Sequence, residues 1–351
     1  MSSPKIAVIG AGIVGASIAL HLVRRGGDVT VFDPGDPARA ATQGSLAWIN
    51  AHLSESEAYF RLRVRSLKLW KSLSTSVPGL PLRLSGSLNW EEMRGKMSAV
   101  VEDHNRLGHE THLVTREEIT RIVPSIDPPD QALWCPAEGL ADPDRIAWAF
   151  LSAAVAAGAR LHQVLEVVRL DPDHGKVVLE DGTEITFDQT VVAAGLSSVR
   201  LLEHIGIDLP LDASPGMLLR TDPQAPLAQP FLASPQAHFW QMGDGRIIAG
   251  ADYAGTHDDE AVDATAAEVL STLQALFPGT TMIEDERRIT NRPMPRDGFP
   301  ILGSVPGHPK LSIAVMHSGV TLAPVVGEMM AAHLLGNGDP DLAAYSLSRF
   351  G

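Results

Sequence analysis

The sequence predicts an α/β protein in which a doubly wound, mainly parallel sheet is accompanied by a second lobe with a mixed or antiparallel sheet. Three observations carry this prediction. A strand–helix–strand pattern is complete within 33 residues, short apolar runs rich in β-branched residues recur downstream, and alternating strand patterns fill the region 215–253. With 351 residues, the chain is long enough for two domains.

Composition and charge argue against several classes of protein. A net charge of −14, with 42 acidic against 28 basic residues, leaves no basic stripe for a nucleic-acid backbone. Cys135 is the only cysteine, which excludes an internal disulfide and a multi-cysteine zinc site, and the 13 histidines are scattered along the sequence, so we expect no metal. Without a leader pattern or a long uncharged apolar run, we expect a cytoplasmic protein with no membrane span.

The first strand–helix–strand unit is the clearest local pattern. Lys5–Ile9 is almost continuously apolar, which suits a central parallel strand buried on both faces. The apolar period becomes helical over 13–25, and a second strand over 28–32 closes on Asp33.

The turn of this unit carries the spacing G-x-G-x-x-G, formed by Gly10, Ala11, Gly12, Ile13, Val14 and Gly15. Between a strand and a helix this spacing has a mechanism: a tight turn, backbone access for a pyrophosphate, and close helix–strand packing. The helix N-terminus then offers unpaired N–H groups to the phosphates. The alternative is a simple tight connection without a ligand.

Asp33, at the tip of the second strand, is placed to accept hydrogen bonds from ribose hydroxyls and would repel a 2′-phosphate. The alternative for this residue is a solvated strand end or a helix cap. We favour the ribose contact.

Further elements follow in order. Helical spacing covers 55–73, 91–107, 145–157, 261–277 and 321–335. Strand patterns cover 86–90, 160–170, 176–179, 190–194, 246–250 and 311–316. A proline-punctuated linker lies near 124–136, and we expect 292–303 to be a loop.

Seven blocks of sequence, in this order, resemble the superfamily of FAD-dependent oxidoreductases that contains D-amino-acid oxidase, glycine oxidase and sarcosine oxidase (the DAO superfamily). The resemblance covers most of the chain. Its pieces are the first unit ending at Asp33, and then 41–50 (ATQGSLAWIN), 138–143 (EGLADP), 191–195 (VVAAG), 244–250 (DGRIIAG), 292–298 (RPMPRDG) and 319–324 (GVTLAP).

The resemblance implies FAD as the cofactor and a set of residues around it. The ADP half would lie on the glycine turn and Asp33, the adenine near Val167, and the pyrophosphate near Ala194 and Gly195. The ribityl chain and flavin edge would follow Arg39, Thr42, Ser45, Leu46 and Ala47. The residues at the N-terminus of the last helix would stabilise negative charge on the reduced flavin; they are Gly319, Val320, Thr321 and Leu322.

The same resemblance implies two catalytic residues. Arg292 matches an arginine that clamps the substrate carboxylate, for which a planar guanidinium is suited; the alternative is a surface ion pair with the acids at 284–286. His317 lies where related enzymes place a residue over the flavin; the alternative is a buried, hydrogen-bonded histidine at a helix start. Four further residues could line the pocket, although core packing is favoured for each: Trp48, His238, Trp240 and Tyr253.

Two departures from the family pattern bear on the chemistry. In the sarcosine-oxidase branch, the position that Ile248 occupies here holds a lysine that activates oxygen. The resemblance therefore leaves open whether the electron acceptor is O2 or another, unidentified molecule. That branch also attaches its flavin through a cysteine near the C-terminal block, which holds Met316 here, so we expect noncovalent FAD and a small, semi-buried Cys135.

These observations predict a discontinuous FAD-binding lobe of the Rossmann type, built from 1–50, 136–214 and 290–351, with an inserted α+β substrate lobe built from 51–135 and 215–289. The expected function is oxidation of a C–N bond in a small amino or imino acid, with hydride passing to the flavin and the imine then hydrolysing. Two alternatives stay open: an FAD-dependent 2-hydroxy-acid dehydrogenase, and a flavin-carrying subunit of a heteromeric amine or opine oxidoreductase that needs a partner subunit.

Overall fold

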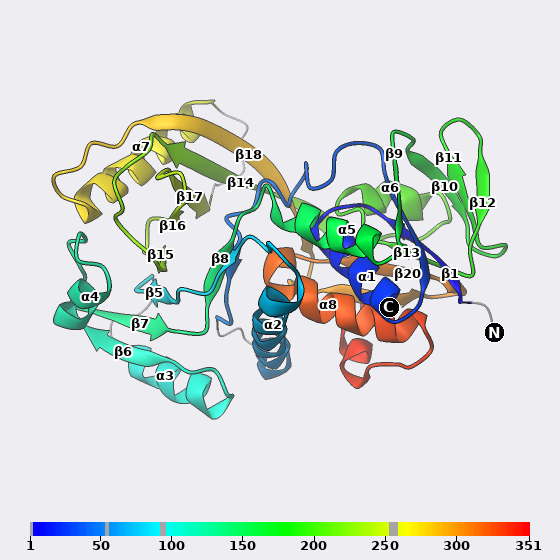
Figure 1. Ribbon diagram of the computed structural model, residues 1–351, viewed down its shortest axis with the longest axis horizontal. Helices are drawn as coiled ribbons and strands as arrows, with labels where there is room; N and C mark the ends of the chain where they lie inside the picture. Colours follow the sequence, from blue (N-terminus) through cyan, green and yellow to red (C-terminus); the bar gives the residue numbers. More distant parts are fainter. Residues whose placement is uncertain (1–2, 53–55, 92–95, 253–258) are drawn as a thin grey trace.

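Two lobes lie side by side along the long axis of the molecule (Figure 1). The computed structural model describes residues 3–52, 56–91, 96–252 and 259–351. One lobe is built on a six-stranded, mainly parallel sheet and the other on an eight-stranded mixed sheet. The predicted fold class, a doubly wound lobe with a second α+β lobe, is therefore confirmed.

The six-stranded sheet has the order β19-β20-β13-β1-β2-β9, in which only the β19–β20 pair is antiparallel. Its strands are β1 (Lys5–Ile9), β2 (Asp28–Asp33), β9 (Arg160–Gln163), β13 (Gln189–Val192), β19 (Ile301–Val305) and β20 (His308–Val315). β1 is central, and Ile6, Ala7 and Val8 are fully buried. This burial on both faces explains why β1 reads as a continuous apolar run.

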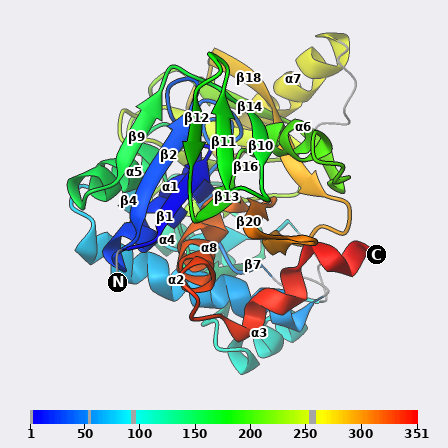
Figure 2. The ribbon, with the colours of Figure 1, turned by 90° about the vertical axis from the view of Figure 1, so that its right-hand side faces the viewer.

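Four helices share the hydrophobic core on one face of this sheet: α1 (Ile13–Arg24), α2 (Glu57–Ser76), α5 (Ile146–Ala156) and α8 (Gly319–Leu334). The helix and second strand of the first unit begin where the sequence predicts. α2 packs against α8, as both ribbon views show, although it lies in the range 51–135 that the sequence assigns to the second lobe (Figures 1 and 2). The exact division into lobes stays a prediction.

The opposite face of the six-stranded sheet is covered by a small antiparallel sheet and helix α6 (Ser197–Glu203). The small sheet comprises β10 (Val167–Asp171), β11 (Lys176–Leu179) and β12 (Glu184–Thr186). Together the two coverings make this lobe a three-layer structure, with the parallel strands in the middle layer (Figure 1).

The second lobe holds the sheet β18-β14-β17-β16-β15-β5-β7-β6, which is antiparallel except for the β15–β5 pair. Its strands are β5 (Ser87–Asn89), β6 (His112–Thr115), β7 (Gln131–Cys135), β14 (Leu211–Thr221), β15 (Phe231–Ala233), β16 (His238–Gln241), β17 (Ile247–Asp252) and β18 (Glu284–Pro295). Helices α3 (Met97–Arg106), α4 (Arg116–Ile122) and α7 (Asp259–Leu276) accompany it.

A short three-stranded sheet and two terminal 3-10 helices complete the chain. The sheet has the order β3-β8-β4, with β3 (Trp48–Ile49), β4 (Leu82–Arg83) and β8 (Gly139–Ala141). The 3-10 helices are η1 (Pro340–Tyr345) and η2 (Leu347–Phe350).

The expectation of a loop over 292–303 is wrong at both ends, because β18 covers its first residues and β19 begins at Ile301. β18 continues through Arg292 and ends at Pro295, pairing with β14 so that Arg292 lies opposite Ser214. β18 is an edge strand and pairs with one neighbouring strand only. Its prolines at 293 and 295, which have no N–H to donate, therefore interrupt no hydrogen-bond ladder on a second side. The two prolines therefore indicate an edge rather than a loop.

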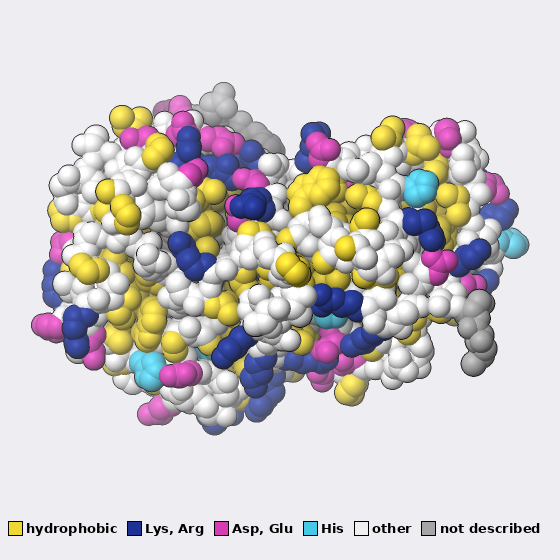
Figure 3. Space-filling view, viewed as in Figure 1, with side chains coloured by type: hydrophobic (Ala, Val, Ile, Leu, Met, Phe, Trp, Pro, Cys, Tyr) yellow, Lys and Arg dark blue, Asp and Glu magenta, His cyan; other side chains and the backbone are white. Residues whose placement is uncertain are grey.

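Charge on the surface is mixed. The face shown in Figure 3 carries acidic and basic side chains next to one another. Exposed ion pairs among the described residues include Arg61 with Glu57 and Lys176 with Glu184. Among the described helices, none is both long enough and apolar enough to cross a membrane.

The turn from β1 into α1 requires glycine at two positions. Gly10 has φ +105°, and a Cβ there would lie 2.5 Å from the carbonyl oxygen of Ala193, which follows β13. A Cβ on Gly15, in the first turns of α1, would lie 2.0 Å from the carbonyl oxygen of Gly10. The helix can therefore lie this close to the sheet only because both residues lack a side chain.

We expect Gly15→Ala to destabilise the protein by about 2 kcal/mol or more, because the new methyl group collides with backbone that cannot move without disturbing β1. Gly243→Ala is the matched control, since a Cβ at that turn would meet nothing within 4 Å, and it should change stability by less than about 0.5 kcal/mol. Urea unfolding of both variants checks this. Equal stability of the two variants would contradict the packing argument.

Candidate functional site

A cavity of about 790 Å³ begins at the β1–α1 turn and continues to the second lobe. Its walls come from the ends of β1, β2 and β20, the segment 38–50, and strands β14, β17 and β18. It therefore lies beyond the carboxyl ends of the parallel strands, where ligands bind in open α/β sheets.

Most of the sequence-predicted cofactor residues line this cavity: Gly10, Gly12, Ile13, Val14, Asp33, Arg39, Thr42, Ser45, Leu46, Ala47, Val167, Ala194, Gly195, Gly319, Val320 and Thr321. The other three, Ala11, Gly15 and Leu322, are buried behind its wall. Residues from distant parts of the sequence are thus brought together along one surface.

Side-chain oxygens hold the backbone of the glycine turn in place. Asp33 accepts hydrogen bonds from the N–H groups of Ala11, at 2.8 Å, and Gly35, at 3.1 Å, which fixes its carboxylate at the end of β2. Thr42 accepts a hydrogen bond from the N–H of Ile13 at 3.0 Å, so the segment 38–50 docks on the start of α1. The result is a helix N-terminus that faces the cavity.

A second helix N-terminus reaches the cavity from β20. Ser318, the residue before α8, has φ +55° and ψ +28°, a left-handed conformation that costs energy for a residue other than glycine. Thr321, in the first turn of α8, donates a hydrogen bond to the carbonyl oxygen of Trp48 at 2.9 Å. The start of α8 is therefore tied to the cavity wall opposite it.

Both sequence-predicted catalytic residues line the same cavity. The guanidinium of Arg292 donates to the hydroxyl of Ser214 at 3.0 Å and to the carbonyl of Pro215 at 3.2 Å. The nearby acids at 284–286 instead pair with Arg287, Arg246 and other arginines. His317 has its Nδ1 3.3 Å from the Ser318 hydroxyl.

Of the four candidate pocket-wall residues, two line the cavity, one is buried behind its wall, and one lies outside the described residues. Trp48 and His238 line the cavity, and the Trp48 ring stacks on Phe231 with 4.4 Å between ring centroids. Trp240 is buried behind the wall and donates to the carbonyl of Leu46 at 2.8 Å, in agreement with core packing. Tyr253 lies outside the described residues.

Glu138 is a buried carboxylate beside this wall, and sequence reasoning assigned it no role. It accepts hydrogen bonds from Trp48 Nε1 at 3.1 Å, the N–H of Ala51 at 2.8 Å and the Ser87 hydroxyl at 2.6 Å, and it lies 3.1 Å from His109 Nε2. Burial alone would raise the pKa of Glu138, but the bonds from His109, Ser87 and Ala51 hold this pKa below its usual value.

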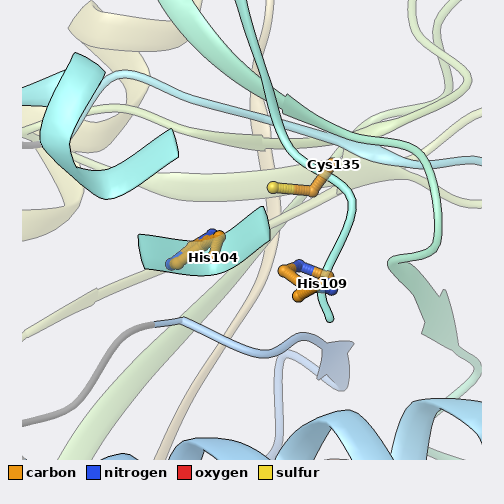
Figure 4. A group of neighbouring side chains, drawn as sticks. All are labelled: His104, His109 and Cys135. Carbon is orange, nitrogen blue, oxygen red and sulfur yellow. The ribbon is translucent and has the colours of Figure 1, made fainter. Parts of the chain in front are cut away.

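His104, His109 and Cys135 form a buried cluster next to Glu138 (Figure 4). Their possible ligand atoms lie within 4.8 Å of one another. The spacing of the histidines in the sequence did not indicate this cluster. The Thr111 hydroxyl lies 2.9 Å from His104 Nδ1 and 3.5 Å from Cys135 Sγ, and His104 Nε2 is buried without a hydrogen-bond partner among the described residues. Burial, with the charge of Glu138, raises the pKa of the Cys135 thiol, which is more buried than the sequence suggested.

Three comparisons with known proteins indicate the family and the fold of this chain. Residues 5–333 match the model of the family described as FAD dependent oxidoreductase (DAO). An opine oxidase subunit of Rhizobium meliloti is 27% identical over 98% of this chain and 96% of that protein, and glycine oxidase of Bacillus licheniformis is 25% identical over 94% and 92%. The crystal structure of L-proline dehydrogenase from P. horikoshii matches with a TM-score of 0.89 at 26% identity, covering 99% of this chain and 98% of that chain.

We expect acid to destabilise the protein partly through His104. Burial lowers the pKa of His104 to about 4, whereas an unfolded histidine titrates near 6.5. As the pH falls between these values the unfolded state binds the proton first, so His104 removes up to about 1.4 kcal/mol of stability per pH unit, and the loss stops below pH 4.

Urea unfolding of wild type and His104→Asn between pH 7 and pH 4 measures this effect. The stability advantage of wild type over the variant should shrink as the pH falls. His112→Asn, at an exposed position, serves as the control. An advantage that does not change with pH would contradict the burial argument.

Proposed function

This chain belongs to the FAD-dependent oxidoreductase family, and we propose that it oxidises the C–N bond of a small amino or imino acid. The observation that carries the proposal is the position of Arg292 and His317. Both line the cavity that begins at the glycine turn of a dinucleotide-binding unit. Relatives named as a glycine oxidase and as an opine oxidase subunit support the substrate class.

The residues of the cavity fit FAD. A Cβ on Gly12 would lie 3.3 Å from the Thr42 hydroxyl, so a side chain there would narrow the approach to the start of α1. Asp33 closes the ribose end, and the α1 N-terminus favours a pyrophosphate. The cavity volume is within the range of cofactor sites. We propose that Gly10, Gly12, Thr42 and Asp33 hold the ADP half.

Bound FAD would supply the two-electron acceptor, and the protein's part is then orientation. We assign carboxylate binding to Arg292, whose guanidinium is held at the cavity by Ser214 and Pro215. A planar guanidinium binds a carboxylate through two parallel hydrogen bonds, which fixes the direction of the substrate's α-carbon. His317, at the start of α8, would flank the reacting end.

FAD binding is proposed to be noncovalent. Cys135 is the only cysteine in the sequence, and it is buried in the second lobe rather than among the residues that line the cavity. Ile248, at the position where the resemblance implies an oxygen-activating lysine, is fully buried in an apolar cluster. We therefore propose that the reduced enzyme reacts slowly with O2, and the choice between O2 and another electron acceptor stays open.

A second candidate function is a flavin-carrying subunit of a heteromeric opine or amine oxidoreductase. The observation that favours it is the match over 98% of this chain to proteins named as a subunit of opine oxidase. Reduction of the isolated chain by substrate, followed by slow reoxidation in air, would be expected of both candidates. Recovery of a stable complex from the native source would favour the subunit.

Anaerobic mixing of the purified chain with a panel of amino, imino and 2-hydroxy acids tests the reaction class. We expect an amino or imino acid to bleach the flavin absorption, with ammonia or an amine released on turnover. Bleaching only by 2-hydroxy acids would establish the hydroxy-acid alternative, and bleaching by none of them would count against the proposal.

Replacing Arg292 should separate substrate binding from cofactor binding. We expect Arg292→Ala to lower kcat/KM for the best amino acid by about 100-fold or more, because a charge-assisted bidentate contact is lost, while FAD content stays unchanged. Arg296→Ala is the matched control, since Arg296 is an exposed residue near Asp212 and should leave kcat/KM unchanged. Equal effects of both substitutions would rule out a specific clamp.

A further inference from the structure

Arg63 is a buried arginine on α2 that the site described above does not use. It is 7% exposed, and it donates to the Asn50 carbonyl at 3.3 Å, the Tyr59 hydroxyl at 3.3 Å and the Ser318 hydroxyl at 3.1 Å. It also donates to the Asn50 side-chain oxygen. Within the described part of the chain, every partner of Arg63 is neutral.

This environment is unusual because an arginine cannot discharge by losing its proton. A buried charge is costly unless an opposite charge compensates it. Arg65, two residues along the same helix, shows the ordinary arrangement, since it pairs with Glu328 and Asp339 at 2.8 Å each. Arg63 therefore carries a permanent positive charge that the described residues leave uncompensated.

The contacts of Arg63 lead directly to the cavity wall. Both Asn50 and Ser318 line the cavity, and Ser318 is the left-handed residue at the start of α8. A second pair of α2 side chains, Ser66 and Trp70, donates to the Thr321 carbonyl at 2.6 and 3.0 Å. Arg63 thus both braces the strained turn and adds its charge to the positive N-terminal end of α8.

The direction of the cavity determines which part of a bound dinucleotide lies near the charge of Arg63. Its first end is the glycine turn with Asp33, which suits the pyrophosphate and ribose of the ADP half. The cavity then continues along 42–48 to Asn50, Ser318 and Arg292. An extended dinucleotide that starts at the glycine turn must place its redox-active half toward this second end.

We propose that Arg63 is a positioning residue whose buried charge raises the reduction potential of bound FAD. The proposal rests on FAD binding as given above. A positive charge in a poorly solvated region favours the form of the cofactor with more negative charge, which is the reduced form. Arg63 acts on the flavin through the electrostatic field of its charge and through its hydrogen bonds to Asn50 and Ser318. It does not need to contact the reacting atoms.

The test is the midpoint potential of FAD, measured by anaerobic dye equilibration, in four variants. Arg63→Gln removes the charge and should lower the equilibrium constant for reduction at least about tenfold, which is about 30 mV for a two-electron couple. Arg63→Lys keeps the charge and should stay within about threefold of wild type. Arg65→Gln, the control, should leave the potential unchanged.

Asn50→Asp keeps the proposal testable where Arg63→Gln fails to fold. A carboxylate at position 50 would pair with Arg63 at nearly unchanged shape, and it should lower the potential like Arg63→Gln does. A wild-type potential in a folded, FAD-loaded Arg63→Gln or Asn50→Asp protein would overturn the inference, as would an equal drop in Arg65→Gln. If wild type binds no FAD, the proposed function fails together with this inference.

Discussion

The close backbone approach between β1, α1 and β13 is the constraint on which the rest of the structure depends. Gly10 lies against Ala193, and Gly15 lies against Gly10, at distances that exclude a side chain at either glycine. This approach sets α1 on the sheet with its N-terminus at the cavity, and the segment 38–50 can then dock on α1 through Thr42. The same segment continues into β3, which carries Trp48 to the junction of the lobes.

Buried polar groups rather than apolar contacts alone hold this junction. The Glu138 carboxylate binds groups from β3, β5 and the connection after α3, so a single anion orients elements of the three-stranded and the eight-stranded sheet. Arg63 connects α2 to the start of α8 in the same way, through hydrogen bonds to the Asn50 carbonyl and the Ser318 hydroxyl. Because a buried charge must be surrounded by partners at defined positions, such groups specify the arrangement of the cavity walls more narrowly than hydrophobic packing does.

Local features of this fold could be predicted from the sequence, whereas features made by distant residues could not. The glycine turn and Asp33 lie within one strand–helix–strand unit, so their spacing alone indicated a dinucleotide site. Arg63 and Ser318 are 255 residues apart, and Glu138 and Trp48 are 90 residues apart, so no local pattern shows these contacts. An arginine on the apolar stripe of the 55–73 helix was the one available signal for Arg63. The loop expected at Arg292 failed because proline is compatible with both a loop and an edge strand.

We propose that one cavity holds noncovalent FAD next to a carboxylate clamp, and an absorption spectrum of the purified protein tests this arrangement most directly. We expect flavin bands that correspond to one FAD per chain. Acid precipitation should release that flavin into the supernatant. A colourless protein that cannot be reconstituted with FAD would contradict FAD binding by this cavity, and flavin that stays with the precipitate would contradict its noncovalent attachment.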